Sequence, residues 1–207
     1  NGETVVDSRD VKLLHETALL PVWYFPERDV RADVLRPSAH HTTCPFKGEA
    51  SYYSVAVGDR VGENKVWYYP DPLGTVPGLA GHVAFYWDAM DAWYEEDEEV
   101  FVHPRDPYHR VDVVPTSRHI VVTVNGDAVA DTRRARALFE TSLPTRWYIP
   151  AEDVHVDRLT KTETSTRCPY KGVARYWSIP DAGEAGTNLV WSYPEPIPAV
   201  GDIAGLL

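Results

Sequence analysis

The chain is poor in methionine, cysteine and basic residues, and it has no long apolar run. It contains one Met and two Cys in 207 residues, and no apolar stretch approaches the roughly 20 residues that cross a bilayer as a helix. Two distant cysteines exclude a disulfide-rich scaffold and favour free thiols in a reducing, cytoplasmic setting. The net charge of −11 argues against nucleic acid or an anionic membrane as a partner.

Aromatic and turn-forming residues, in contrast, are abundant. There are 12 Tyr, 7 Trp, 17 Pro and 13 Gly. Prolines and glycines at this frequency predict many turns and few long helices. Aromatic rings either fill cores or line binding surfaces, so their placement bears directly on function.

The sequence repeats itself at a constant shift of 124 residues, which aligns Asn1 with Asn125. This shift sets "WYFPERDV" on "WYIPAEDV", "CPFKG" on "CPYKG" and "VWYYPDP" on "VWSYPEP" without a gap. A gapless match of this length predicts two copies of one domain. We assign residues 1–99 to the first repeat, 100–116 to a connector and 117–207 to the second repeat. The alignment also predicts that the first repeat lacks its first strand and the second its last.

Each repeat has the patterns of a β domain. "RHIVVTVNG" before the second repeat predicts a hairpin that turns at Asn125 and Gly126. Runs such as "ASYYSVAV" and "KVWYYP" are rich in β-branched and aromatic residues. The one helix that we expect spans Asp88–Glu99, with Met90 and Trp93 on one stripe. The fold class is therefore mainly β: two tandem copies of a small antiparallel domain with little helix.

The repeated motifs "CP-aromatic-KG" and "VWxYPxP" resemble those of a bacterial family called domain of unknown function 427, in its tandem form. The resemblance covers nearly the whole chain. It implies a small β fold of the tent-like type that zinc-binding and sulfoxide-reducing relatives share, and it implies no settled activity. The family also carries a nucleotidyltransferase-like label. The sequence lacks the Gly-Ser and paired metal-binding carboxylates that polymerase-type nucleotidyl transfer requires.

The two cysteines occupy matched positions, each followed by a lysine. Cys44 with Lys47, and Cys168 with Lys171, could form thiolate nucleophiles stabilised by a nearby cation. Thiol-based or acyl-transfer catalysis is therefore one hypothesis. In the alternative, each cysteine is a small buried residue at a strand end and the lysine is solvated. No histidine accompanies both copies, so a Cys–His pair recurring in both is excluded.

The aromatic residues that recur in both copies suggest a binding site. Trp67 and Tyr69 stand two apart, so on a strand they share one face. Beside a lysine and a glutamate, such rings could line a cleft for a planar or cationic ligand; alternatively, they fill a small core. The candidate ligand-binding residues are Glu16, Trp23, Lys47, Tyr52, Trp67 and Tyr69 in the first repeat and Glu140, Trp147, Lys171, Tyr176, Trp191 and Tyr193 in the second.

We assign no metal or cofactor to the chain. His103, Asp106 and His109 in the connector are possible ligands, but a structural zinc site requires four ligands in spaced pairs. The leading hypothesis is a module that binds a small molecule or a peptide in each repeat. A third hypothesis is an interaction scaffold whose acidic connector docks a basic partner.

Overall fold

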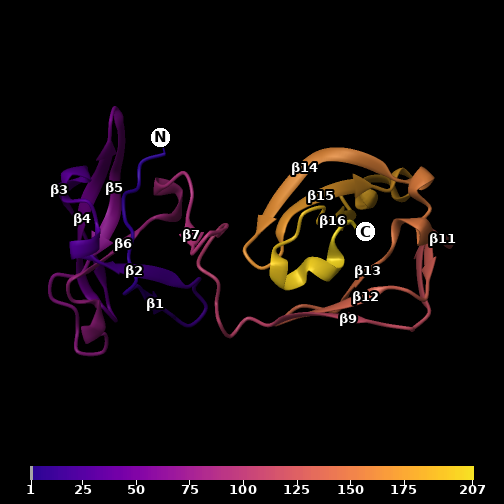
Figure 1. Cartoon of the computed structure of the whole chain (residues 1–207), viewed down its shortest axis with the longest axis horizontal. Coiled ribbons are helices and arrows are strands. Elements are labelled where there is room, and N and C mark those ends of the chain that lie inside the picture. Colours follow the sequence, from indigo (N-terminus) through magenta and orange to yellow (C-terminus); the bar gives the residue numbers. More distant parts are fainter. Residues whose placement is uncertain (1) are drawn as a thin grey trace. The chain divides into compact units, whose positions relative to one another are not determined.

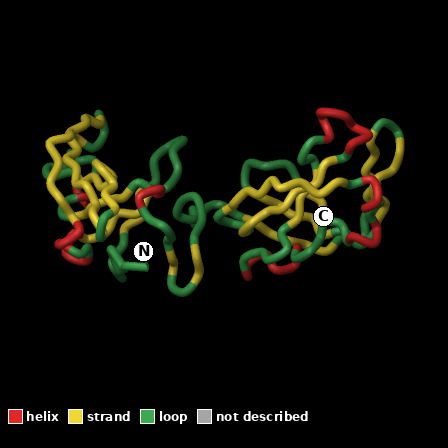
Figure 2. Tube along the Cα trace, turned by 90° about the horizontal axis from the view of Figure 1, so that it is seen from above, coloured by secondary structure: helices red, strands yellow, loops and turns green. Residues whose placement is uncertain are grey.

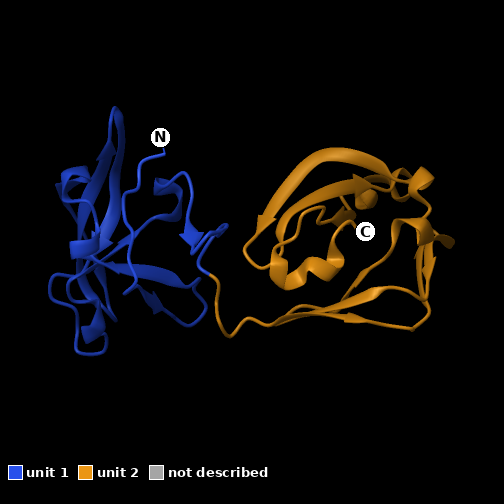
Figure 3. Cartoon of the chain, viewed as in Figure 1, with its two compact units in different colours: residues 1–104 blue, residues 105–207 orange. Residues whose placement is uncertain are grey.

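Strands and turns make up most of both repeats, and the helical segments are short (Figure 1, Figure 2). The computed structural model describes residues 2–207, so Asn1 lies outside the described residues. The chain divides into unit 1, up to Pro104, and unit 2, from Arg105 onward (Figure 3). None of the helical segments in residues 2–207 has the length and apolar character needed to span a membrane.

Unit 1 is built on one antiparallel sheet with the strand order β1-β2-β6-β5-β4-β3. These strands are β1 Lys12–Leu14, β2 Val22–Pro26, β3 Leu35–Cys44, β4 Gly48–Val57, β5 Arg60–Tyr68 and β6 His82–Phe85. Single 3-10 turns follow several of them: η1 Glu27–Asp29, η2 Ala32–Val34, η3 Pro77–Leu79 and η4 Trp87–Ala89. The sheet predicted for each repeat is thus present in unit 1.

Both faces of this sheet are covered, because successive side chains of a strand point to opposite sides. One face carries the Phe25 cluster, which includes Val66, Val83 and Trp93. The other face carries the Tyr24 cluster, whose buried members are Tyr24, Ala50, Tyr52, Tyr69, Leu79 and Ala84. A two-faced core explains why the strands are rich in large apolar residues at consecutive positions.

Unit 2 contains the corresponding elements, arranged as three smaller sheets: β13-β12-β9, β14-β15-β16 and β10-β11. Its strands are β9 Val111–Pro115, β10 Ile120–Val124, β11 Asp127–Thr132, β12 Arg136–Glu140, β13 Arg146–Tyr148, β14 Thr160–Cys168, β15 Gly172–Ser178 and β16 Val190–Ser192. Its 3-10 segments are η5 Ala151–Asp153, η6 Val156–Arg158, η7 Pro180–Gly186 and η8 Pro198–Ile203.

The strand registers of the two units agree wherever both units form the ladder. Tyr52 pairs with Trp67 in unit 1, and Tyr176 pairs with Trp191 in unit 2. At the end of the chain, Leu207 and Ile149 exchange backbone hydrogen bonds of 2.7 and 2.9 Å. Two mainly β copies with little helix, as predicted, are therefore confirmed.

The hairpin expected at Asn125 and Gly126 is also confirmed. Strands β10 and β11 pair antiparallel around it. Both turn residues have positive φ, 53° for Asn125 and 93° for Gly126. Positive φ at both central residues defines the turn that fits the twist of a two-residue hairpin, and Asn-Gly is its preferred sequence.

The helix expected over Asp88–Glu99 is wrong. The segment forms the turn η4 and then a two-stranded hairpin of β7 Tyr94–Glu95 and β8 Glu98–Glu99. Trp93 is buried in the Phe25 cluster and stacks on Trp87 with 5.1 Å between ring centroids. Its indole N–H also donates to the Trp87 carbonyl at 3.0 Å. Packing of these two rings overrides the apolar stripe on which the helix prediction rested.

The connector expected over residues 100–116 requires a correction as well. Strand β9, Val111–Pro115, pairs with β12 along its whole length and belongs to unit 2. The prolines and charges of this stretch suggested a linker, but Val111 and Val113 pack against the core of unit 2. Pairing with β12 and packing of Val111 and Val113 on the core therefore make residues 111–115 a strand of unit 2.

Candidate functional site

In both units, the Cys-Pro-aromatic-Lys-Gly motif forms the tight turn between two long strands. The turn closes where the amides of Lys47 and Lys171 donate to the carbonyls three residues earlier, at 3.4 and 3.3 Å. The glycine that follows has φ of 103° in Gly48 and 102° in Gly172. This is a conformation that residues with a Cβ rarely adopt, so glycine is required there. The turn therefore accounts for the glycine of the motif in both copies.

Each of these lysines forms a short ion pair with the matched glutamate. Lys47 Nζ lies 2.5 Å from Glu16 Oε1, and Lys171 Nζ lies 2.5 Å from Glu140 Oε2. Both lysine side chains are 10% exposed, whereas the exposed fraction is 25% for Glu16 and 6% for Glu140. Lysines are almost never buried unless they are paired. The duplicated domain thus holds a nearly buried ammonium–carboxylate pair in each copy.

The aromatic residue of the same motif precedes the lysine of each pair. We call Glu16, Phe46 and Lys47 the Lys–Glu site of unit 1, and Glu140, Tyr170 and Lys171 that of unit 2. Phe46 is 71% exposed. Leu19 and Leu143 lie in the turns that follow Glu16 and Glu140. Their exposed fractions are 64% and 52%. Each site therefore combines a buried ion pair with apolar surface.

Several of the predicted aromatic residues gather beside this site. Tyr69 and Tyr52 are buried in the Tyr24 cluster, and Trp67 packs against it. The Trp67 indole N–H donates to the Tyr24 hydroxyl at 3.0 Å, and Trp191 donates to Tyr148 at 3.2 Å. In unit 2, Tyr193 is likewise buried, with Tyr176 and Trp191 packed against its cluster. Most of these rings are core residues that back the ion pair.

Burial controls the chemistry of these phenols. It raises the pKa of Tyr24 and that of Tyr148 to about 12 each. Burial is also the main cause of the raised pKa of Tyr69 and Tyr193, to which the nearby glutamates Glu16 and Glu140 contribute. The raised pKa keeps these four tyrosines neutral at physiological pH. They are suited to hydrogen bonding rather than to attack as phenolates.

Two predicted ligand-binding residues lie elsewhere. Trp23 points to the opposite face of the sheet, where it packs against Phe25, Trp87 and Trp93. Trp147 packs on the separate cluster of Ala130, Ala135 and Ile149, with the Arg118 guanidinium 5.7 Å from its ring. The alternation of side chains along β2 explains the separation, since Tyr24 and Trp23 are neighbours in sequence.

The cysteines are both free thiols, as predicted, and both are partly buried. Cys44 and Cys168 end strands β3 and β14 and pack against the Tyr24 cluster and its counterpart in unit 2. The lysine of each motif is bonded to a glutamate rather than to the thiol. Packing, rather than activation by Lys47 or Lys171, accounts for the position of the two sulfurs.

One residue that was not predicted for this site contacts it. His109, which precedes β9, places its Nε2 3.1 Å from Glu140 Oε1. Its ring stacks on Tyr170 with 4.0 Å between centroids and 19° between planes. Sequence reasoning noted His109 only as a possible metal ligand in the connector. The signal in the sequence that could have pointed to this site is the aromatic residue of the repeated motif, which is Phe46 in the first copy and Tyr170 in the second.

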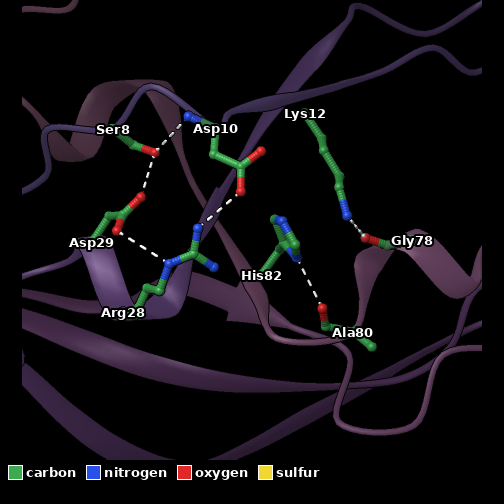
Figure 4. Close-up of polar contacts among 8 residues, drawn as sticks. All are labelled: Ser8, Asp10, Lys12, Arg28, Asp29, Gly78, Ala80 and His82. Atoms are coloured by element: carbon green, nitrogen blue, oxygen red, sulfur yellow. Dashed lines mark hydrogen bonds and ion pairs between the residues drawn. The ribbon is translucent and has the colours of Figure 1, made fainter.

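A second set of polar contacts in unit 1 involves the segment before β1, η1 and β6 (Figure 4). Arg28 donates to Asp10 at 2.8 Å, which lowers the pKa of that carboxyl. The His82 ring donates from Nδ1 to the Ala80 carbonyl at 2.8 Å, since a carbonyl can only accept. His82 Nε2 is buried, and it has no hydrogen-bond partner in residues 2–207. Unit 2 has Arg134, Glu152 and Leu206 at the equivalent positions of Asp10, Arg28 and His82.

Two further features complete the survey of possible sites. A cavity of about 470 Å³ in unit 2 is lined by residues 111–114 of β9 and residues 198–202 of η8. Within residues 2–207, no group of three or more His, Cys, Asp or Glu side chains is arranged to hold a metal ion. The Lys–Glu pair recurs in both units, as do the hydroxyl–carboxylate bonds Ser8–Asp29 and Thr132–Asp153.

Comparison with known proteins agrees with this two-copy organisation. The sequence model of one family, described as Domain of unknown function (DUF427), matches residues 1–96 and again residues 112–207. Both matches include the turn motif and the paired lysine and glutamate. A comparison with curated proteins returns no match.

Proposed function

The chain belongs to the DUF427 family, with two copies of its domain, and from this premise we propose that each repeat binds a small molecule or a peptide segment at its Lys–Glu site. The two free thiols support a reducing, cytoplasmic setting for this activity. The observation that carries the proposal is the nearly buried ion pair that both copies retain.

Stability alone gives little reason for such a pair. Removing two charges from water costs several kcal/mol per ion, so a buried ion pair is often no more stabilising than a well-packed apolar pair. Other charged positions have been exchanged between the copies, as Asp10 and Arg134 show. Retention of lysine and glutamate together, beside exposed apolar side chains, therefore favours a role in recognition.

The unused hydrogen-bonding capacity indicates the class of ligand. An ammonium has three donors, and within residues 2–207 Lys47 Nζ makes one described hydrogen bond, to Glu16 Oε1. The second oxygen of Glu16 has no described partner in the same range. Unit 1 thus offers donors and an acceptor side by side, in a motif that also carries the exposed Phe46 ring. A planar group that carries both an acceptor and an N–H, such as an amide, complements this arrangement.

Benzamide, titrated into the ¹⁵N-labelled full chain, tests the proposal by amide chemical shifts. We expect shifts at Gly48 and at Leu73, whose amide donates to the Lys47 carbonyl at 3.0 Å. Benzoate lacks the N–H donor and should bind at least about tenfold more weakly, because a lost hydrogen bond to a charged group is worth about 1.5–3 kcal/mol.

Variants locate the effect. Lys47→Met, and Glu16→Gln as a second variant that keeps the side-chain shape, should abolish or weaken the shifts. Lys65→Met is the matched control, because Lys65 forms a comparable but exposed pair with Asp88 at 2.7 Å. The proposal fails if benzamide perturbs neither Lys–Glu site, or if Lys65→Met has the same effect as Lys47→Met.

A further inference from the structure

The cavity of unit 2 is formed by a strand on one side and a 3-10 segment on the other. Residues 111–114 of β9 make one wall, and residues 198–202 of η8 make the other. Its volume of about 470 Å³ lies within the roughly 300–1,000 Å³ that ligand pockets span. The lining residues include none of the three that form the Lys–Glu site of unit 2. A ligand of this cavity would therefore be additional to the one proposed above.

Both walls are fixed parts of the domain. β9 pairs with β12 along its whole length, and η8 is anchored by Val200, which is 2% exposed. The counterparts of Gly201 and Asp202 in unit 1 are Pro77 and Gly78, and both are exposed although β6 and the segments after it are present in that unit. Those later segments of the domain therefore leave the η8 wall open.

β9 is an edge strand of its sheet, whose order is β13-β12-β9. At one end of its ladder with β12, the Thr116 amide donates to the Ala135 carbonyl at 3.2 Å. At the other end, the Thr141 amide donates to the Arg110 carbonyl at 3.0 Å. Bonded and non-bonded pairs alternate along an antiparallel ladder. Residues 112 and 114 are therefore bonded to β12, whereas the backbone groups of residues 111, 113 and 115 point away from it.

The outward backbone groups on the cavity wall have no partners. Val111 and Val113 offer an N–H and a C=O each, and within residues 2–207 none of these four groups has a described hydrogen bond. Pro115 takes the next outward position, which suits a residue that has no N–H to donate. A row of unpaired N–H and C=O groups at a sheet edge is a template for a further strand.

We propose that the cavity of unit 2 binds an extended peptide segment, which adds a strand to the free edge of β9. The peptide main chain bonds to the outward groups of Val111 and Val113. About four peptide residues cover the wall, because a strand rises about 3.3 Å per residue. Main-chain bonds of this kind provide affinity, and the side chains at alternate peptide positions provide specificity.

The charges and apolar groups of the walls indicate which side chains the peptide carries. Val111 and Val113 pack against the core of unit 2, so apolar side chains suit that face. Asp112 and Asp202 also line the cavity. Asp202 is 60% exposed and lies 3.9 Å from Arg136, so its charge is available to a ligand. A peptide in which basic and apolar residues alternate therefore complements the site.

The probe is acetyl-Lys-Val-Lys-Val-Lys-amide, titrated into the ¹⁵N-labelled full chain and followed by amide hydrogen exchange. In the free chain, the amides of Val111 and Val113 should exchange faster than those of Asp112 and Val114, which are bonded to β12. Saturating peptide should slow the exchange of Val111 and Val113 at least about tenfold, since exchange requires that their new bonds open.

Methylation of the peptide nitrogens separates strand addition from binding through side chains alone. One edge of an extended peptide faces β9 and the other faces away. N-methyl groups on one alternate set of amides should therefore weaken binding at least about tenfold, through the loss of backbone hydrogen bonds. N-methyl groups on the other set should leave the affinity unchanged. The peptide acetyl-Glu-Val-Glu-Val-Glu-amide should bind several-fold more weakly, because Asp202 repels it, and Asp202→Asn should remove that difference.

A glycine in the η8 wall allows the cavity to be blocked. A Cβ at Gly201 would meet no atom within 4 Å, so Gly201→Trp adds a ring at the cavity wall without a backbone clash and should abolish binding. Gly74→Trp is the matched control, since Gly74 lies in unit 1 with equally open surroundings. This variant should bind the peptide as the parent chain does.

The inference is overturned if the lysine peptide does not bind, if both methylated peptides bind as well as the parent peptide, or if Val111 and Val113 gain no protection. Binding that survives Gly201→Trp would also contradict it. Protection of Val111 and Val113 that rises with protein concentration, in the absence of peptide, would assign the edge to a second copy of the chain instead.

Discussion

Charge has been retained at some positions of the duplicated domain and exchanged at others. Lys47 and Lys171 keep their glutamate partners at the same 2.5 Å. In contrast, the Asp10 carboxylate that pairs with Arg28 is replaced by Arg134, which turns instead to Asp153 at 2.6 Å. Exposed pairs of the second kind contribute little to stability and tolerate such exchange. The contrast separates side chains that serve the solvated surface from those that serve the Lys–Glu site.

His82 is a position at which one copy has a polar side chain and the other an apolar one. Its Nε2 is buried without a partner in residues 2–207, and the equivalent residue of unit 2 is Leu206. A buried polar atom without a hydrogen bond costs about 1–3 kcal/mol. The second copy demonstrates that a leucine fits at this place in the fold, so the imidazole is not required for folding.

We therefore expect His82→Leu to stabilise unit 1 by about 1 kcal/mol, after the loss of its bond to Ala80 is subtracted. Urea unfolding, followed by tryptophan fluorescence, measures the change as a higher midpoint with an unchanged slope. Leu206→His is the reciprocal control and should destabilise unit 2. A lower midpoint for His82→Leu would show that the Nδ1 bond to the Ala80 carbonyl outweighs the unpaired nitrogen.

Among the secondary-structure elements, the strand ends differ most between the units. In unit 1, β4 and β5 continue as a paired hairpin through Val57 and Arg60. In unit 2, the same stretch forms η7, which begins at Pro180. Proline lacks the N–H that a strand ladder needs and fits the first position of a helical turn. One substitution at the position of Ala56 thus explains why β15 and β16 are shorter than their counterparts.

Gly186 is the residue that allows η7 to fold back on β15. The Ile179 amide donates to the Gly186 carbonyl at 2.9 Å, and a Cβ on Gly186 would lie 2.1 Å from the Ile179 carbonyl oxygen. Backbone atoms at that distance must move apart. The equivalent Gly62 of unit 1 would place a Cβ 3.1 Å from a flexible Lys65 side-chain carbon and 3.2 Å from Val55.

Gly186→Ala should therefore destabilise unit 2 by about 2 kcal/mol or more, the range of overpacking in a tight site. Gly62→Ala should cost less than about 1 kcal/mol, because its loss of unfolded-state entropy offsets part of the crowding. Urea midpoints of the two variants provide the comparison. Equal costs would mean that η7 relaxes freely around residue 186.

The accuracy of sequence prediction also depended on the type of element. The Asn125-Gly126 hairpin was predictable because its turn chemistry is local. The helix over Asp88–Glu99 was not, since packing of Trp93 on Trp87 decides that segment. At the candidate site, matched positions in the repeat pointed to the Lys47–Glu16 pair, which the structure joins at 2.5 Å. The contact of His109 with Glu140 could not be predicted from the sequence, because it depends on how β9 pairs with β12.

At the scale of the whole molecule, each unit has the apolar clusters of an independent domain. The Phe25 and Tyr24 clusters lie within unit 1. The clusters around Leu138 and around Ala130 lie within unit 2. A domain that has its own hydrophobic core can fold alone. The boundary of that domain, however, depends on whether β9 is included, because Val111 and Val113 pack against the core of unit 2.

Two fragments of unit 2 test this boundary. A fragment of residues 105–207 retains β9 and should unfold in a single cooperative transition in thermal circular dichroism.

A fragment of residues 117–207, the boundary expected from sequence, loses the pairing of β9 with β12 from Val111 to Pro115. It also loses the burial of two valines and should be less stable by at least about 2 kcal/mol, judged from apolar side-chain burial. Against the 5–15 kcal/mol that is typical of a domain, that loss lowers the urea midpoint measurably. Equal midpoints for the two fragments would contradict the assignment of β9 to unit 2 and return residues 105–116 to the role of a connector.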